Sequence, residues 1–225
     1  MTDPMETRTS GRGPGLRLLG LRGGPLALAS RSPRRRELLE RLQVPLLILP
    51  SNVPEGNRKP EESPEIYVRR LALEKASAIL AQARAKGAYA CLGADTVVEV
   101  DGEVLEQPRD RADAIRLLGL IGGRWHVVWS GLALIHLGTG RHALTAESSR
   151  VFFEALPDDG REVYLETEEP MDKAGAYGIQ GWGGIFVPRI EGDFFNVMGL
   201  PLAALRRVCL ETERLAEAER PARAE

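Results

Sequence analysis

The residues with the clearest chemical potential lie in one short stretch, Leu28-Ala29-Ser30-Arg31-Ser32-Pro33-Arg34-Arg35-Arg36-Glu37-Leu38-Leu39. An apolar run ends at Ala29, and a serine followed by a proline is typical of a helix start. Free backbone N–H groups, the hydroxyls of Ser30 and Ser32, and four arginines then meet at one helix N-terminus, which is a favourable site for phosphate. The alternative is a strand-to-helix turn whose arginines are solvated.

A second candidate is Asp95, inside the apolar run Leu92-Gly93-Ala94-Asp95-Thr96-Val97-Val98. A carboxylate among such neighbours is costly unless it is paired, hydrogen-bonded or bound to a metal ion. Asp95 is therefore the best candidate for a functional acid. The alternative is that the strand ends earlier and that Asp95 belongs to a loop.

Two lysines and one glutamine complete the set of candidates. Lys75 lies on the apolar stripe of a predicted helix. Its ammonium group either points into a polar site or reaches water along the protein surface. Burial statistics favour the second alternative. Lys173 and Gln180 belong to a glycine-rich segment, 169–184, where glycines would let the backbone approach a ligand closely. The alternative for both is an ordinary surface loop.

These residues are suited to one kind of chemistry. Cations can hold phosphates, while Asp95 and Glu55, the latter in a proline-rich polar loop, can hold a hard divalent cation that activates water. The combination predicts a phosphoanhydride hydrolase. The sequence lacks a P-loop, a His-Glu-x-x-His motif and a Gly-x-Ser-x-Gly motif. The three histidines lack zinc-ligand spacing and are predicted to be structural.

The elements that would position these residues alternate between strands and helices early in the chain, and hairpins dominate its middle. Strands are predicted at 25–29, 45–49, 90–100, 103–105, 125–136, 142–153, 185–190 and 194–198. Helices are predicted at 32–42, 64–86, 110–120 and 158–166, and another from Pro201 onward. This order predicts a mixed sheet bent across two lobes.

Composition restricts the class further. The chain has 225 residues, of which 43% are hydrophobic and 28% charged, and its net charge is -2. Such a balance fits one α/β domain and gives no basic footprint for nucleic acid or an acidic membrane surface. No apolar run is long enough to span a bilayer. The two cysteines are far apart in the sequence, which favours a reducing, cytoplasmic compartment. Residues 1–24 are predicted to be a flexible extension, 25–210 a single domain and 211–225 a charged tail.

Five motifs, taken in chain order, resemble the Maf family of nucleotide pyrophosphatases. They are Ser30-Arg31-Ser32-Pro33-Arg34-Arg35, Pro50-Ser51-Asn52-Val53-Pro54-Glu55, Gly93-Ala94-Asp95-Thr96, Lys173-Ala174-Gly175-Ala176-Tyr177-Gly178-Ile179-Gln180-Gly181 and Gly199-Leu200-Pro201-Leu202. The resemblance covers residues 25–210. The segment around Gln180 is similar to the branch that hydrolyses dTTP and UTP, whereas the branch acting on 7-methyl-GTP differs there.

The resemblance implies an α/β fold of the Maf/inosine-triphosphatase type, with a long bent mixed β-sheet flanked by helices in two lobes and a central cleft. It implies a homodimer, a divalent metal such as Mg²⁺ or Mn²⁺, and hydrolysis of a nucleoside triphosphate to the monophosphate and pyrophosphate. Asp95 matches the family's proton acceptor. Substrate choice is tied to the positions of Arg34, Thr96 and Gln180, and the polar positions expected to hold metal or phosphate are those of Glu55, Arg35, Lys75 and Lys173.

One departure concerns Glu106-Gln107-Pro108, where members of the family usually have a lysine in place of Gln107. Losing a charge-assisted phosphate contact would cost about 1–3 kcal/mol of transition-state binding. Two alternatives therefore stay open. One is the same reaction on another or a modified nucleotide, and the other is a nucleotide-binding regulator, for instance of cell division, with weak catalysis.

Overall fold

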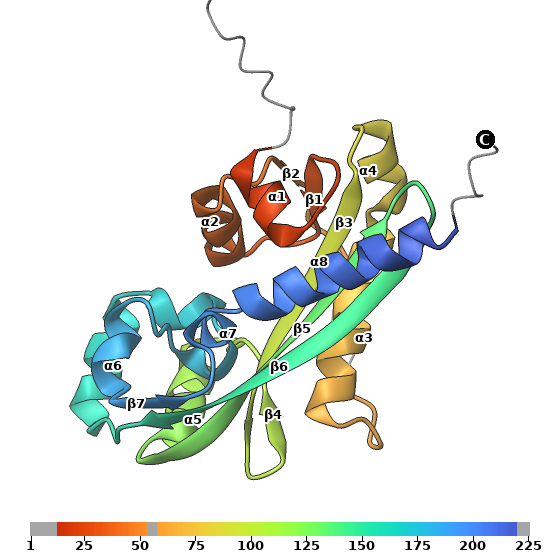
Figure 1. Ribbon diagram of the computed structural model, residues 1–225. Helices are drawn as coiled ribbons and strands as arrows, with labels where there is room; N and C mark the ends of the chain where they lie inside the picture. The colour runs from red at the N-terminus through yellow and green to blue at the C-terminus, as the bar shows by residue number, and fades with distance from the viewer. Residues whose placement is uncertain (1–12, 54–57, 220–225) are drawn as a thin grey trace, which may run out of the picture.

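The computed structural model describes residues 13–53 and 58–219. Within these residues, seven strands form one mixed sheet in the order β2-β1-β3-β5-β6-β7, with β4 paired to β3 (Figure 1). The strands are β1 (Leu26–Leu28), β2 (Leu46–Ile48), β3 (Ala90–Val100), β4 (Glu103–Leu105), β5 (Arg124–His136), β6 (His142–Phe153) and β7 (Arg189–Glu191). Because β1 pairs in parallel with β2 and β3 while the other pairs are antiparallel, the predicted mixed α/β sheet is confirmed.

Helices flank this sheet. They are α1 (Pro14–Leu19), α2 (Pro33–Arg41), α3 (Pro64–Ala78), α4 (Leu80–Ala85), α5 (Arg111–Ile121), α6 (Asp158–Glu166), α7 (Phe194–Val197) and α8 (Leu202–Glu217), with 3₁₀ turns η1 (Glu169–Asp172), η2 (Ala174–Ala176) and η3 (Trp182–Phe186). The starts of α2, α3 and α5 follow from side-chain caps. Ser32, Ser63 and Asp110 each accept a hydrogen bond from the backbone N–H three residues further on.

The long strands β3, β5 and β6 form the body of the sheet and connect its two ends (Figure 1). At one end, β1, β2, α1 and α2 form a lobe, and at the other end α5, α6 and β7 form a second one. The turn between β3 and β4 contains Asp101 and Gly102, both with positive φ (51° and 82°), as the predicted tight hairpin requires.

Helix α3 approaches the sheet so closely that only glycine fits beneath it. A Cβ atom on Gly93 of β3 would lie 2.0 Å from the carbonyl oxygen of Ala72, and one on Gly131 of β5 would lie 2.2 Å from that of Val68. These two glycines therefore set the position of α3 over β3 and β5. Successive residues of β3 face opposite sides, since Cys91 packs with Ala76 of α3 whereas Leu92 packs in the cluster that contains Leu205 of α8.

The predicted flexible extension is wrong for residues 13–24. Helix α1 forms there, and Leu16, Leu19 and Leu21 are buried. The helix lies beside α8, where a Cβ atom on Gly20 would touch Leu210, so tertiary burial outweighs the glycine-rich composition. Residues 1–12 lie outside the described residues.

The predicted tail is wrong in the same way for residues 211–219, and residues 220–225 lie outside the described residues. Helix α8 continues to Glu217, and Thr212, Glu213 and Ala216 on it are buried. The carboxylate of Glu213 accepts hydrogen bonds from the backbone N–H of Arg22 (3.1 Å) and from the hydroxyl of Tyr89 (3.0 Å). The last turns of α8 are therefore fastened to the segment that follows α1.

Three further predictions are corrected. The predicted helix 64–86 is interrupted at Ile79, which separates α3 from α4. The predicted strand 194–198 is helix α7, because Asp193 caps the N–H of Phe195 at 2.8 Å and outweighs the β-preference of two phenylalanines. The predicted strand 185–190 is shorter in the structure. Its first residues belong to η3, and only its last residues belong to β7.

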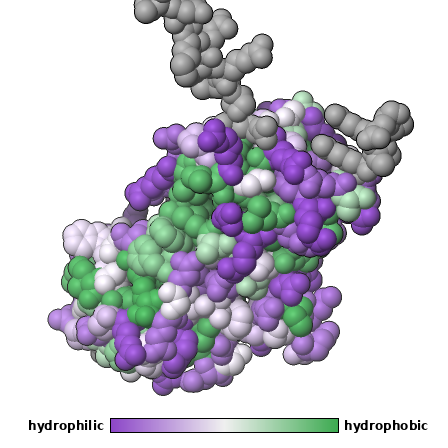
Figure 2. All heavy atoms as spheres, viewed as in Figure 1, coloured by the Kyte–Doolittle hydropathy of each residue, from purple (hydrophilic) through white to green (hydrophobic). Residues whose placement is uncertain are grey.

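The surface around α7 is partly apolar. Figure 2 shows hydrophobic residues gathered on this face around α7 and the start of α8, where Phe194 and Phe195 are exposed. Hydrophilic residues surround this area. Across the described ranges, no helix is both long and apolar enough to cross a membrane.

Candidate active site

The candidate site lies where β1 ends and the edge of β3 becomes open. The pairing of β1 with β3 stops at Leu28 opposite Leu92, and α2 begins five residues after Leu28. Ligands bind preferentially at the carboxyl end of such a parallel strand, where the chain turns into a helix. Asp95 and Thr96 follow directly on the open edge of β3, and they point to opposite faces of the sheet.

On the α3 face, Asp95 pairs with Lys75. The Lys75 Nζ atom lies 2.6 Å from Oδ1 of Asp95, and the two side chains are 10% and 7% exposed. The preference of burial statistics for a solvated Lys75 is therefore wrong. Because α3 approaches β3 closely at Gly93, the Lys75 side chain lies over the Asp95 carboxylate and points into a polar site.

On the opposite face, Arg35 is a buried centre of hydrogen bonds. It donates to the carbonyl oxygens of Gly199 (2.9 Å) and Ala94 (2.9 Å), and to the hydroxyls of Ser30 (3.1 Å) and Thr96 (2.9 Å). The sequence predicts phosphate binding for Arg35, but its guanidinium already donates to these protein acceptors. Its geometry suits a residue that positions Thr96 and the helix start.

Thr96 and Ser32 also have defined partners. The hydroxyl of Thr96 lies 2.9 Å from that of Ser130 on the paired strand β5, directly opposite in register. The hydroxyl of Ser32 caps α2. That of Ser30 accepts from the backbone N–H of Ser32 at 3.2 Å. The hydroxyls at this helix start are thus arranged by the fold itself.

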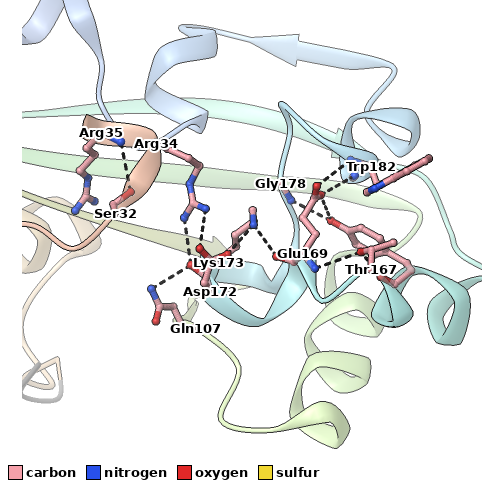
Figure 3. Close-up of polar contacts among 12 residues, drawn as sticks. Ser32, Arg34, Arg35, Gln107, Thr167, Glu169, Asp172, Lys173, Gly178 and Trp182 are labelled. Carbon is pink, nitrogen blue, oxygen red and sulfur yellow. Dashed lines mark hydrogen bonds and ion pairs between the residues drawn. The ribbon is translucent and has the colours of Figure 1, made fainter. Parts of the chain in front are cut away.

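The second wall of the cleft comes from η1 and the residue after it (Figure 3). The Asp172 carboxylate accepts from Arg34 Nη1 (3.1 Å) and Lys173 Nζ (2.6 Å), and its main-chain oxygen accepts from Arg34 Nη2 and from Gln107. Burial alone would raise the pKa of Asp172, but the hydrogen bond from Lys173 and the charge of Arg34 hold that pKa below its ordinary value. A carboxylate therefore occupies the space between two cations expected to bind phosphate.

The predicted site residues line three adjoining hollows that share Arg35 and Gln107. One contains Arg34, Thr96, Lys173 and Gln180, the second contains Ser30, Ser32, Arg34 and Lys75, and the third contains Lys75, Asp95 and Thr96. The structure thus brings together all the predicted site residues that it describes. Glu55 lies outside the described residues.

The donor set at Asp95 is compatible with a divalent cation. Within residues 13–53 and 58–219, no cluster of three or more His, Cys, Asp or Glu side chains could hold a metal ion. Glu106 lines the same hollow as Asp95 and accepts from the hydroxyl of Tyr67 at 2.6 Å. Because a hard divalent cation can be held by one or two carboxylates together with substrate phosphates, the residues present are compatible with such an ion.

Sequence reasoning assigned no role to three residues at the site. Asp172 joins both walls, Glu106 lines the same hollow as Asp95, and Ser130 contacts the hydroxyl of Thr96. Asp172 could be identified from its position next to Lys173, and Glu106 from its position next to Gln107. Ser130 gives no such signal, since only the strand register places it opposite Thr96.

These features define an α/β protein with a cation-lined cleft for a polyphosphate anion beside a buried carboxylate. The family model described as Maf-like protein matches residues 25–212, and the chain belongs to the Maf family. The dTTP/UTP pyrophosphatase of Caldanaerobacter subterraneus subsp. tengcongensis is 44% identical over 79% of this chain and 84% of its own length. Proteins of the same name from Symbiobacterium thermophilum (48% identical, 79% and 88%) and Pectobacterium atrosepticum (47%, 79% and 87%) are also similar. The resemblance noted from the motifs is confirmed.

Proposed function

We propose that this chain is a nucleoside triphosphate pyrophosphatase that hydrolyses dTTP and UTP to the monophosphate and pyrophosphate. The observation that carries the proposal is the buried Lys75–Asp95 pair beside a cleft lined by Arg34 and Lys173. Relatives with the name dTTP/UTP pyrophosphatase support the choice of substrate.

Asp95 accepts the proton of the attacking water in this proposal. Lys75 engages Oδ1 of the carboxylate, so we assign Oδ2 to the water. The water oxygen attacks the α-phosphorus, its proton passes to Asp95, and the bond to the bridging oxygen breaks with pyrophosphate as the leaving group. Mg²⁺ or Mn²⁺, held by Asp95 with Glu55 and the phosphate oxygens, would supply charge neutralisation.

The triphosphate lies across the start of α2, where Arg34, Lys173 and the positive end of the helix dipole neutralise its charge. Its arrival requires Arg34 and Lys173 to exchange the Asp172 carboxylate for phosphate oxygens. Gln180 reads the pyrimidine, because an amide can both donate to O4 and accept from N3–H of uracil or thymine. Thr96, which contacts Arg35 and Ser130, lines the same hollow as Gln180.

A panel of canonical and modified triphosphates, each offered with Mg²⁺ or Mn²⁺, tests the proposal. We expect the largest kcat/KM for UTP and dTTP. A larger kcat/KM for another base would indicate that the chain catalyses the same reaction on another nucleotide. Saturable binding without turnover would favour a nucleotide-binding regulator, an alternative supported by Gln107 in place of the usual lysine.

The oligomeric state and the cellular location belong to the same proposal. The resemblance implies a homodimer, which light scattering of the purified chain would test. We also propose a cytoplasmic location, because the substrates are components of the intracellular nucleotide pool. Fractionation of expressing cells checks it, and recovery outside the cytoplasm would contradict it.

A further inference from the structure

We propose that Glu169 is a positioning residue for base selection, because its carboxylate holds the loop that carries Gln180. This inference rests on the proposed function, in which Gln180 reads the base. Glu169 begins η1, eleven residues before Gln180, and its carboxylate accepts hydrogen bonds from Tyr164, Trp182 and Gly183.

The Glu169 carboxylate accepts three hydrogen bonds (Figure 3). Oε1 accepts from the hydroxyl of Tyr164 (2.7 Å) and from the backbone N–H of Gly183 (3.0 Å), and Oε2 accepts from the backbone N–H of Trp182 (3.0 Å). The hydroxyl of Tyr164 in turn accepts from the backbone N–H of Gly178 at 3.1 Å. Residues on both sides of Gln180 are therefore fastened to one carboxylate and its tyrosine.

The glycines of this loop are explained by the same contacts. A Cβ atom on Gly181 would lie 1.8 Å from Oε2 of Glu169, and one on Gly183 would lie 2.5 Å from the Tyr164 hydroxyl. The loop can enclose the carboxylate only because side chains are missing at these positions. Gln180 is exposed at the tip of this enclosed turn, on the wall of the cleft.

Glu169 also contacts the phosphate side of the cleft. Its main-chain oxygen accepts from Lys173 Nζ at 2.6 Å. One residue therefore connects the proposed base reader with a proposed phosphate ligand. Because the carboxylate and the carbonyl group act on different partners, a change of the side chain affects the Gln180 loop more than it affects Lys173.

Glu169→Gln is the informative variant, because it keeps the size of the side chain. A carboxylate presents only acceptors to these donors, whereas an amide turns one NH₂ group toward an N–H donor. We expect kcat/KM for UTP to fall at least tenfold, mainly through KM, while kcat/KM for CTP changes less than threefold. Glu166→Gln removes the same charge from the exposed end of α6 and keeps the wild-type preference.

Tyr164→Phe is a second variant, which retains the ring that packs against Phe186. It removes the hydroxyl that donates to Glu169 and accepts from Gly178, so the UTP preference shifts in the same direction. An equal loss on every nucleotide, with the UTP-to-CTP ratio unchanged in both variants, would overturn the proposal and leave Glu169 with a merely structural role.

Hydrogen exchange separates this inference from the proposed function. In Glu169→Gln the amides of Trp182 and Gly183 lose protection, whereas the amides of β5 keep theirs. Unchanged protection of these two amides would contradict the proposed hold on the loop whatever the substrate is. A wild-type chain that shows no preference for UTP or dTTP would instead contradict the proposed function.

Discussion

Lys75 Nζ and Asp95 Oδ1 lie 2.6 Å apart in a buried ion pair that joins α3 to β3. The two residues are distant in the sequence. The pair can form because Gly93 and Gly131 allow α3 to approach the sheet closely. A buried charge needs such a partner, because removing one member of a buried pair typically costs about 3–5 kcal/mol of stability. The pair therefore fixes a carboxylate at the edge of the polyphosphate cleft.

Asp95→Asn should lose nearly all turnover while nucleotide binding remains. The amide cannot accept the proton of the attacking water, so we expect kcat to fall about 10²–10⁴-fold. Binding of UTP, measured by calorimetry, should stay within a few-fold of wild type. Asp101→Asn, in the exposed turn at the end of the same strand, is the matched control. Near-normal rates in Asp95→Asn would remove this residue from catalysis.

Gly93→Ala should both destabilise the fold and reduce turnover. The added methyl group would lie 2.0 Å from the carbonyl oxygen of Ala72, so α3 must move away from β3 and carry Lys75 with it. We expect a loss of about 1–3 kcal/mol in the free energy of unfolding, measured with urea. Gly119→Ala, inside α5 and in ordinary contact with its neighbours, should instead stabilise the chain by about 0.5–1 kcal/mol. A neutral Gly93→Ala would contradict the close approach of α3.

Gln107→Lys should raise kcat/KM. A lysine at this position, shared by all three hollows, would add a charge-assisted phosphate contact, and an increase of about tenfold corresponds to about 1.4 kcal/mol. Gln107→Met is the control, because it removes the hydrogen bond from the amide to the Asp172 carbonyl without adding charge. If the lysine variant is no faster than wild type, other cations already neutralise the phosphates.

The free energy of unfolding should depend on His126. Burial lowers the pKa of this histidine from 6.5 to about 4. Between these values the unfolded chain binds a proton that the folded chain does not, so stability falls as the pH falls from about 6.5 to about 4, by on the order of 3 kcal/mol. His126→Gln should flatten this part of the profile, whereas the exposed His142→Gln should not. An unchanged slope in His126→Gln would show that other groups cause it.

Much of the framework could be predicted because its causes are local. The serine and proline at the start of α2, the tight turn at Asp101-Gly102 and the apolar run of β3 are readable from neighbouring residues. Asp95 stood out for the same reason, since a carboxylate in an apolar strand needs an explanation. Among the described residues, the cleft then contains every site residue that the motifs indicate.

What could not be predicted depends on partners distant in sequence. Helix α1 forms against α8, almost two hundred residues away, so its own composition predicts a flexible segment. The inward turn of Arg35 depends on the carbonyl oxygens of Ala94 and Gly199, which only the fold brings to the start of α2. The bridge from Arg34 to Asp172 likewise joins the two walls of the cleft and leaves no local pattern.

The position of bond cleavage tests the central claim most directly. The chain is incubated with UTP and a divalent metal in ¹⁸O-labelled water, and the products are identified by phosphorus NMR and mass spectrometry. We predict UMP that carries the label on its phosphate, together with unlabelled pyrophosphate. UDP with labelled orthophosphate would contradict attack at the α-phosphorus and, with it, the role assigned to Asp95 in this cleft.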